Sequence, residues 1–253
     1  MSWGAQRRNI ILTVIFLLIF IPAGLISFYL FYTPPTCFDG KQNQGETGID
    51  CGGPCVLLCT DQMTEPVALW KRVFTVSDDG IYNVMAYIEN PNPTGFIKDA
   101  RYIFRIFNED RVLIAERQGV TSILPKSILP LVENNIQTFA QVPTQVTFEF
   151  VGDLVYTRMD PRESLIIVKD ELLENEDFSP RVRAKIQNLS LLPIFDIDVV
   201  VIVYNVFDTV IGVSSTYVDR LLPEETRDIV FTWPIPFSDA YSRIEIIPVY
   251  DNQ

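Results

Sequence analysis

The sequence predicts an all-β protein with two tandem immunoglobulin-like β-sandwich domains, which follow one N-terminal transmembrane helix and a small disulfide-rich segment. Three observations predict this fold. An uncharged apolar run fills residues 10–32, all four Cys residues lie between residues 37 and 59, and the rest of the chain alternates apolar and polar residues between turn signals. We divide the 253 residues into a stub, an anchor, a Cys-rich segment and two sandwiches, at 1–9, 10–32, 33–65, 66–159 and 160–253.

The apolar run at 10–32 has the length of a membrane-spanning helix. At about 1.5 Å per residue it reaches roughly 34 Å, which is enough to cross the hydrocarbon core of a bilayer. Arg7 and Arg8 precede the run, so the positive-inside rule places residues 1–9 in the cytoplasm and the rest of the chain outside. The alternative is a cleaved signal peptide, whose apolar region usually has about 7–15 residues and ends in a small-x-small site. This run has neither feature, so we expect an uncleaved, single-pass signal anchor in the plasma membrane.

Charge and composition exclude several functions. The chain has 20 Lys plus Arg and 32 Asp plus Glu, and Arg7 and Arg8 are the only charges before residue 33, so the external part carries 18 minus 32, or −14. Such a surface repels nucleic acids and anionic lipid headgroups. The chain has no His, which is the commonest general base and metal ligand. We therefore expect no enzyme, no nucleic-acid partner and no small-molecule substrate.

The Cys residues form one local unit. Outside the membrane two disulfides are the default, and three pairings are possible among Cys37, Cys51, Cys55 and Cys59. The segment has too few apolar residues to form a core, so covalent links must stabilise it. We expect no cofactor, but two metal sites are alternatives. The first is Zn²⁺ bound by the four Cys thiolates. The second is Ca²⁺ bound by side-chain oxygens of Asp39, Asn43, Glu46 and Asp50, although their spacing departs from that of the EF-hand loop.

The order of residues in this segment carries a resemblance. Cys-x-Asp-Gly starts at Cys37, Asn-x-Gly-Glu-Thr follows at Asn43, and Asp-Cys-Gly-Gly-x-Cys ends at Cys55. The segment resembles a short Cys-rich motif that recurs in secreted and surface-anchored bacterial proteins. It departs from the familiar form at Cys55-Val56-Leu57-Leu58-Cys59, where a Cys-x-x-Cys is frequent. The resemblance implies an extracytoplasmic location and no particular activity.

Beyond residue 60 the chain repeats itself with a period of 98 residues. Segments 82–90 and 181–188 alternate apolar and polar residues, which is typical of strands with one buried face. An ungapped shift of 98 residues aligns identical residues at three places, namely Val84, Ala86, Ile88 and Asn90 with Val182, Ala184, Ile186 and Asn188, Asp110 with Asp208, and Leu124-Pro125 with Leu222-Pro223. The same shift aligns apolar residues that differ, such as Phe104 with Ile202 and Ile106 with Tyr204. We expect about seven short strands in each repeat, with the acidic stretch 170–177 as an exposed loop.

The second repeat carries a further resemblance. It has a strand that ends in Val201-Ile202-Val203-Tyr204-Asn205, the turn Phe207-Asp208, and the run Leu221-Leu222-Pro223-Glu224-Glu225-Thr226. These residues resemble small extracellular β-sandwich domains named for a Phe-x-Leu-Tyr-Asp motif. The first repeat is further from this motif, with Ile103-Phe104-Arg105-Ile106-Phe107. Such domains occur on membrane-anchored bacterial proteins and mostly lack assigned chemistry, so the resemblance implies fold and location.

Three groups of residues are candidates for chemistry or binding. Asp196 and Asp198 lie two residues apart on a strand and form a carboxylate pair, but we expect them to face solvent while Ile197 and Val199 face the core. Four aromatic residues form either a sugar-stacking platform or parts of the two cores, namely Trp70, Phe231, Trp233 and Phe237. Asn188-Leu189-Ser190 fits the glycosylation sequon.

Together these features predict a membrane-anchored interaction protein. Tethered β-sandwiches without a catalytic set usually act through loops and strand edges. We expect the chain to present its two sandwiches to other proteins of the cell envelope. The alternative is a cell-surface ligand binder for carbohydrate or Ca²⁺.

Overall fold

The structure is a computed structural model that describes the chain except for residues 1–2, 33–35, 140, 162 and 251–253. The outer ends of the predicted ranges 1–9 and 160–253, and the start of 33–65, therefore lie outside the described residues. The internal contacts divide the chain into two compact units, Met1–Cys55 and Val56–Gln253.

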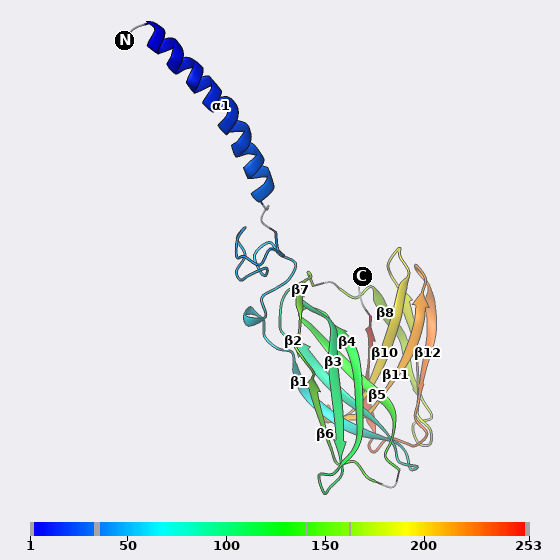
Figure 1. Ribbon diagram of the computed structural model, residues 1–253. Helices are drawn as coiled ribbons and strands as arrows, with labels where there is room; N and C mark the ends of the chain where they lie inside the picture. Colours follow the sequence, from blue (N-terminus) through cyan, green and yellow to red (C-terminus); the bar gives the residue numbers. More distant parts are fainter. Residues whose placement is uncertain (1–2, 33–35, 140, 162, 251–253) are drawn as a thin grey trace. The chain divides into compact units, whose positions relative to one another are not determined.

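The first unit begins with helix α1, Trp3–Phe31, drawn in blue in Figure 1. The helix starts seven residues before the predicted span of 10–32, so it includes Arg7 and Arg8. Apolar side chains lie exposed along its whole length, an arrangement that suits lipid rather than water. Among the described residues, Gln6–Phe31 is the one helix that is long and apolar enough to cross a membrane, a property that a signal sequence near an N-terminus shares.

The second unit consists of antiparallel strands, preceded by the short 3-10 helix η1, Thr60–Gln62. The first seven strands are β1 (Val67–Ser77), β2 (Ile81–Asn90), β3 (Gly95–Phe107), β4 (Leu113–Ile123), β5 (Ser127–Gln137), β6 (Gln145–Phe150) and β7 (Tyr156–Arg158). The other six are β8 (Ile166–Glu174), β9 (Arg181–Asn188), β10 (Ile194–Asn205), β11 (Val210–Leu221), β12 (Thr226–Thr232) and β13 (Tyr241–Val249).

These strands form two β-sandwiches with the same strand order. In the first, sheet β1-β2-β5 packs on sheet β4-β3-β6, and β7 pairs with β3. In the second, sheet β8-β9-β12 packs on sheet β11-β10-β13. Each sandwich encloses its own apolar core, with Phe104 and Ile88 in the first and Val201 and Ile186 in the second. The predicted all-β fold after one helix is confirmed.

The second sandwich differs from the expectation in two details. Its described residues form six strands, whereas those of the first form seven. The acidic stretch 170–177 is an exposed loop only in part, because β8 continues to Glu174 and pairs with β9. Lys185 on β9 binds the Asp170 carboxylate at 2.7 Å, and Arg183 binds that of Glu174 at 3.2 Å. Basic partners on the neighbouring strand thus allow an acidic sequence to remain in the sheet.

The repeat does not keep one period throughout. In the first sandwich Ile88 on β2 pairs with Leu129 on β5. In the second, Ile186 on β9 pairs with Arg227 on β12, so the offset here is 98 residues. In the β3-β4 hairpin, Phe104 pairs with Arg117 as Val201 pairs with Ser214, so the offset is 97. The ungapped alignment is therefore wrong in this hairpin. The core residue Phe104 corresponds to Val201 rather than Ile202, because a shift of one residue turns a strand side chain to the other face.

The identity of Asn90 and Asn188 has a structural cause. Both side chains are buried, and each Asn is the last residue of its strand, β2 in the first sandwich and β9 in the second. The Asn188 Nδ2 donates to the carbonyl oxygens of Leu192, Leu221 and Leu222. The Asn90 Nδ2 donates to those of Gly95 and Leu124. Each Asn thus joins the β2-β3 or β9-β10 connection to the end of β4 or β11 in its own repeat.

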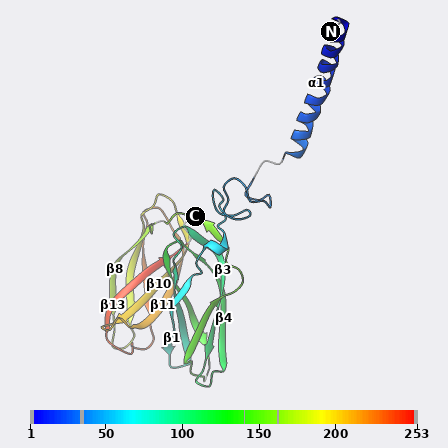
Figure 2. The ribbon, with the colours of Figure 1, turned by 90° about the vertical axis from the view of Figure 1, so that its left-hand side faces the viewer.

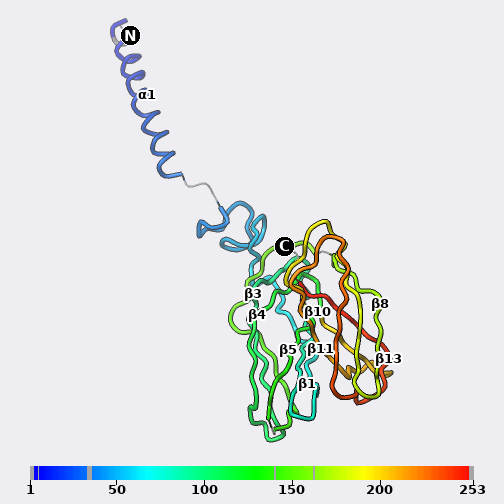
Figure 3. The backbone as a smooth tube through the Cα atoms, turned by 90° about the vertical axis from the view of Figure 1, so that its right-hand side faces the viewer, coloured from blue at the N-terminus to red at the C-terminus, as the bar shows by residue number. Residues whose placement is uncertain are grey.

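The two sandwiches pack face to face through a third apolar cluster. It joins the outer face of sheet β1-β2-β5 to the outer face of sheet β11-β10-β13, and Figures 2 and 3 show the sandwiches side by side from opposite directions. The buried members are Phe74, Met85, Val200, Ile202, Tyr204, Val210 and Val213. Strand β10 is consequently covered on both faces, which explains its continuous apolar run from Val199 to Val203.

Polar contacts fix the register of this interface. Asn83 Nδ2 donates to the Val213 carbonyl oxygen at 3.1 Å, and Arg72 donates to that of Val210 at 3.0 Å. The outer faces away from the interface are charged instead. Met85 corresponds in the second repeat to Arg183, an exposed residue. The difference between Met85 and Arg183 thus shows that this sheet face is covered in the first sandwich and exposed in the second.

Candidate functional site

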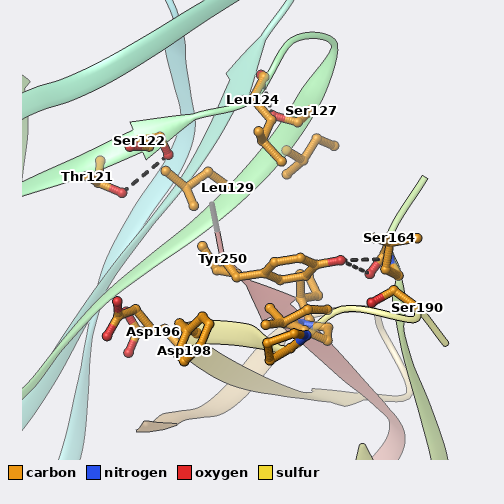
Figure 4. Close-up of a pocket in the computed structure, with 18 of the residues that line it drawn as sticks. Thr121, Ser122, Leu124, Ser127, Leu129, Ser164, Ser190, Asp196, Asp198 and Tyr250 are labelled. Atoms are coloured by element: carbon orange, nitrogen blue, oxygen red, sulfur yellow. Dashed lines mark hydrogen bonds between the residues drawn. The ribbon is translucent and has the colours of Figure 1, made fainter. Parts of the chain in front are cut away.

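A groove of about 740 Å³ lies at one end of the interface between the two sandwiches. The end of β4 and the start of β5 line it from the first sandwich, and the start of β10 and the end of β13 line it from the second. Figure 4 shows Thr121, Ser122 and Leu129 across the open space from Asp196, Asp198 and Tyr250. Because both repeats build the groove, it exists only while they stay packed together.

Apolar side chains form the rim of the groove and remain exposed. The exposed fractions are 58% for Val120, 46% for Ile128, 41% for Leu165, 71% for Leu192 and 52% for Phe195. The hydroxyl groups at the groove make internal hydrogen bonds, as Ser127 Oγ does to the Leu124 carbonyl oxygen. The Tyr250 hydroxyl accepts from the Leu165 backbone N–H at 2.7 Å and lies 3.3 Å from Ser164 Oγ. The site therefore offers apolar surface on a rigid frame.

Among the described residues, the charged side chains that line the groove are all acidic, namely Asp99, Asp196 and Asp198. Asp99 and Asp196 occupy corresponding places in the two repeats, each with a left-handed backbone, at φ of 56° and 51°. Each Asp and the exposed residue before it lie between two buried residues. Strand β3 bulges there, because its register with β4 shifts between Ile97 and Ala100, whereas β10 keeps its register with β11 from Phe195 to Ile197. As predicted, Ile197 and Val199 face the core and Asp196 and Asp198 are exposed; both acids also line the groove.

The groove makes Asp198 an unfavourable place for a negative charge. Burial of the carboxyl raises its pKa, and the nearby carboxylates of Asp196 and Glu133 raise it further. Asp196 accepts a hydrogen bond from the Tyr217 hydroxyl at 2.5 Å. Glu133, on β5, accepts one from Tyr102 at 2.6 Å. Asp196 and Glu133 are satisfied within their own sandwiches, whereas the side chain of Asp198 has no hydrogen-bond or ion-pair partner among the described residues.

We expect Asp198→Asn to raise the melting temperature at pH 7 by about 1–2 °C. A carboxyl whose pKa is raised by folding binds a proton more tightly in the folded state, so ionisation at neutral pH costs stability. The gain should disappear as the pH falls below the ordinary pKa of Asp, where both chains are neutral at this position. Thermal unfolding at several pH values measures this. Asp78→Asn, the same change in an exposed turn, should show no such pattern.

The Cys-rich segment is disulfide-bonded. Cys37 and Cys55 form a disulfide, Cys51 and Cys59 are also in the disulfide form, and the described residues include no free cysteine. The zinc alternative is excluded in this state, because a disulfide sulfur is not a thiolate. Ligand atoms of Cys37, Glu46 and Cys55 lie within 4.8 Å of one another, but two of the three are these bonded sulfurs.

The four candidate Ca²⁺ ligands lie in one hydrogen-bonded chain. Asp50 accepts from the backbone N–H groups of Asp39 and Gly40. Asn43 Nδ2 donates to Asp39 at 2.9 Å, which lowers the pKa of that carboxyl, and Glu46 accepts from the Asn43 backbone. Most of these oxygens are therefore acceptors that shape the loop. The Asn43 Oδ1 is buried and lacks a hydrogen-bond partner.

The four candidate aromatic residues do not share a surface. Phe231 and Trp233 are buried in the second core, where Phe237 packs against Trp233 at 5.0 Å between ring centroids. Trp70 stacks on Tyr87 at 5.3 Å in the interface between the sandwiches. The core interpretation holds for Phe231 and Trp233, and Trp70 belongs to an interface that the sequence reasoning missed.

The sequon is not available to a glycosylating enzyme in the folded chain. Asn188 is fully buried, and its amide donates to three carbonyl oxygens. Its Oδ1 accepts from the Ser190 backbone at 2.8 Å. Asn188-Leu189-Ser190 is thus a structural turn that matches the sequon by composition.

Comparisons with known proteins leave the function open. No family model matches the sequence, and a search of curated proteins gives no significant match. A red sea bream transglutaminase structure is 8% identical with a TM-score of 0.24, over 73% of this chain and 31% of that one. A putative beta-galactosidase from Bacteroides fragilis is 10% identical with a TM-score of 0.22, over 68% and 33%. The chain thus spans about a third of these proteins, and likeness at this level carries no functional argument.

Proposed function

We propose that this chain is a single-pass protein of the cell envelope that holds its two β-sandwiches outside the plasma membrane as a binding surface for other envelope proteins. Helix α1 serves as the uncleaved anchor, with Arg7 and Arg8 retained on the cytoplasmic side. The partners bind the sandwiches, and the protein performs no reaction of its own.

Three features support this location. Helix α1 is long and apolar enough to span a bilayer, and the two Arg residues at its start favour a cytoplasmic N-terminus. The disulfide form of the four Cys residues suits an oxidising compartment. The resemblances of the Cys-rich segment and of the second repeat to surface-anchored bacterial proteins agree with both.

The observation that carries the proposed role is the groove between the packed sandwiches. Its rim exposes aliphatic and aromatic side chains that a monomeric surface usually covers, and such patches mark interaction sites. Two repeats that pack over a shared apolar cluster hold this surface in one shape. A rigid surface loses little conformational entropy on binding, which favours a recognition function.

The test is cross-linking in the intact membrane followed by isolation of the full-length chain. The proposal predicts that a small set of envelope proteins is enriched over a control in which the chain is added only after solubilisation. Recovery of no protein above that control would contradict an interaction function.

A Ca²⁺ binder is the second candidate, favoured by the buried and unpartnered Oδ1 of Asn43, whose amide nitrogen donates to the Asp39 carboxylate. Such an oxygen is the type of ligand that Ca²⁺ accepts. Calorimetric titration of the full chain with Ca²⁺ decides between the two. A saturable isotherm that Asp39→Asn removes favours this candidate, and a flat titration rejects it.

A further inference from the structure

The groove between the sandwiches is lined by acids. In the turns, carboxylates can pair with cations, as Asp208 does with Arg243 and Glu225 with Arg227. Among the described residues, the groove lining contains three Asp residues and neither Lys nor Arg. The side chains of Asp99 and Asp198 make no ion pair or hydrogen bond within this part of the chain. The described lining of the groove is therefore negatively charged.

The apolar rim and the acids lie close together along the chain. Phe195 directly precedes Asp196 on β10, and both line the groove. Val120 and Ile128 face them from β4 and β5 of the other sandwich. A ligand in this groove therefore meets aliphatic and aromatic surface and carboxylates together. The long apolar stem and cationic tip of a Lys or Arg side chain match such a combination.

Charge also decides among possible occupants. A second copy of this chain is disfavoured, because the part after residue 32 has 18 basic and 32 acidic residues. Anionic lipid headgroups are repelled for the same reason. A basic segment of a different protein is attracted, and it would supply the cation that Asp198 lacks.

We propose that the groove between the sandwiches binds a segment of a partner protein that inserts a Lys or Arg side chain, flanked by aliphatic residues, between Asp196 and Asp198 and the apolar rim. This inference rests on the proposed interaction function and names the surface and the chemistry of the partner. The raised pKa of Asp198 agrees with it, because a cation placed in the groove would remove the cost of ionising that carboxyl.

The test is site-specific photo-cross-linking with the full-length chain in its own membrane. p-Benzoylphenylalanine replaces Phe195 in the groove or, as matched positions, Phe178 and Phe207, which are 81% and 80% exposed in turns remote from the groove. We expect the Phe195 position to give the dominant cross-link. Mass spectrometry of the linked peptide should show a Lys or Arg flanked by aliphatic residues.

Charge-removing variants test the acidic part. Asp196→Asn with Asp198→Asn should lower the yield of the Phe195 cross-link at least about tenfold, because the inserted cation loses both carboxylates. Asp78→Asn with Asp79→Asn makes the same change in net charge in the exposed β1-β2 turn and should leave the yield unchanged. Circular dichroism of each variant checks that the fold persists.

Several results would overturn the proposal. They are a Phe195 cross-link that the Asp196 and Asp198 changes leave intact, a linked peptide without Lys or Arg, and a link to a lipid, a glycan or a second copy of the chain. Cross-links from Phe178 or Phe207 without any from Phe195 reject the groove while the interaction function stands. No cross-link from any position rejects both.

Discussion

Replacing Ile202 with aspartate is expected to separate the two sandwiches and to lower the free energy of unfolding by about 3–5 kcal/mol. Ile202 is fully buried in the cluster between the sandwiches, where a carboxylate would lie among apolar side chains. Differential scanning calorimetry measures the effect. The parent chain should unfold its sandwiches in one cooperative transition, and the variant should show two, because each sandwich keeps its own core.

The matched control is Val230→Asp, the same kind of change on the outer face of the second sandwich. Val230 is 46% exposed, and its neighbour across the sheet is Arg183. The control should alter the free energy of unfolding by no more than about 0.5 kcal/mol. Equal losses in both variants, or an unchanged single transition in Ile202→Asp, would contradict the packed arrangement.

Asn188→Ala is expected to lower the free energy of unfolding by about 2–4 kcal/mol. The substitution leaves the carbonyl oxygens of Leu192, Leu221 and Leu222 without the amide that binds them. Chemical denaturation measures the loss. Asn90→Ala should act in the same direction in the first sandwich, where the amide binds two carbonyl oxygens.

Asn188→Asp is the control for this prediction. It keeps the shape of the side chain and an oxygen for the Ser190 backbone, but it removes the donor. A loss at least as large as that of Asn188→Ala is expected, because a carboxylate repels carbonyl oxygens. If Asn188→Ala unfolded at the same denaturant midpoint as the parent, the structural role of Asn188 would be contradicted. The identity of Asn90 and Asn188 would then need another explanation.

Local pattern was enough to predict most of the fold. The uncharged run before residue 33 predicted one helix, and period-two alternation predicted the strands β2 and β9. The prediction of one buried face holds for β9, whereas β2 is buried on both faces because the second sandwich covers its outer face. The offset of 98 residues holds where at least one of two corresponding strands has a polar outer face, as β9 does in the pair β2 and β9. There the alternation fixes which residues face the core.

The same reasoning failed in β10, for a physical reason. Val199 to Val203 are apolar throughout, because the strand is covered by its own core and by the other sandwich. With both faces apolar, a shift of one residue leaves the pattern unchanged. The sequence comparison therefore paired Phe104 with Ile202. A signal for the interface was present, since Met85 and Tyr87 stand where the second repeat has Arg183 and Lys185.

The candidate site was predicted only in part. Asp196 and Asp198 were named from the sequence, but their place in a groove depends on the first sandwich, which packs against β10. Asp99 and Glu133 belong to the other repeat, so no short-range pattern joins them to the pair. The correspondence of Asp99 with Asp196, both with a left-handed backbone, is visible only once the offset of 97 residues is known.

Protease treatment of intact cells, combined with alkylation of the membrane-extracted chain before and after reduction, tests the central claim most directly. The claim is an uncleaved anchor with the sandwiches outside the membrane. It predicts that external protease removes the sandwiches, that the peptide containing Arg7 and Arg8 stays protected, and that all four Cys residues react only after reduction. Sandwiches protected until the cells are broken, or four thiols that react without reduction, would contradict it.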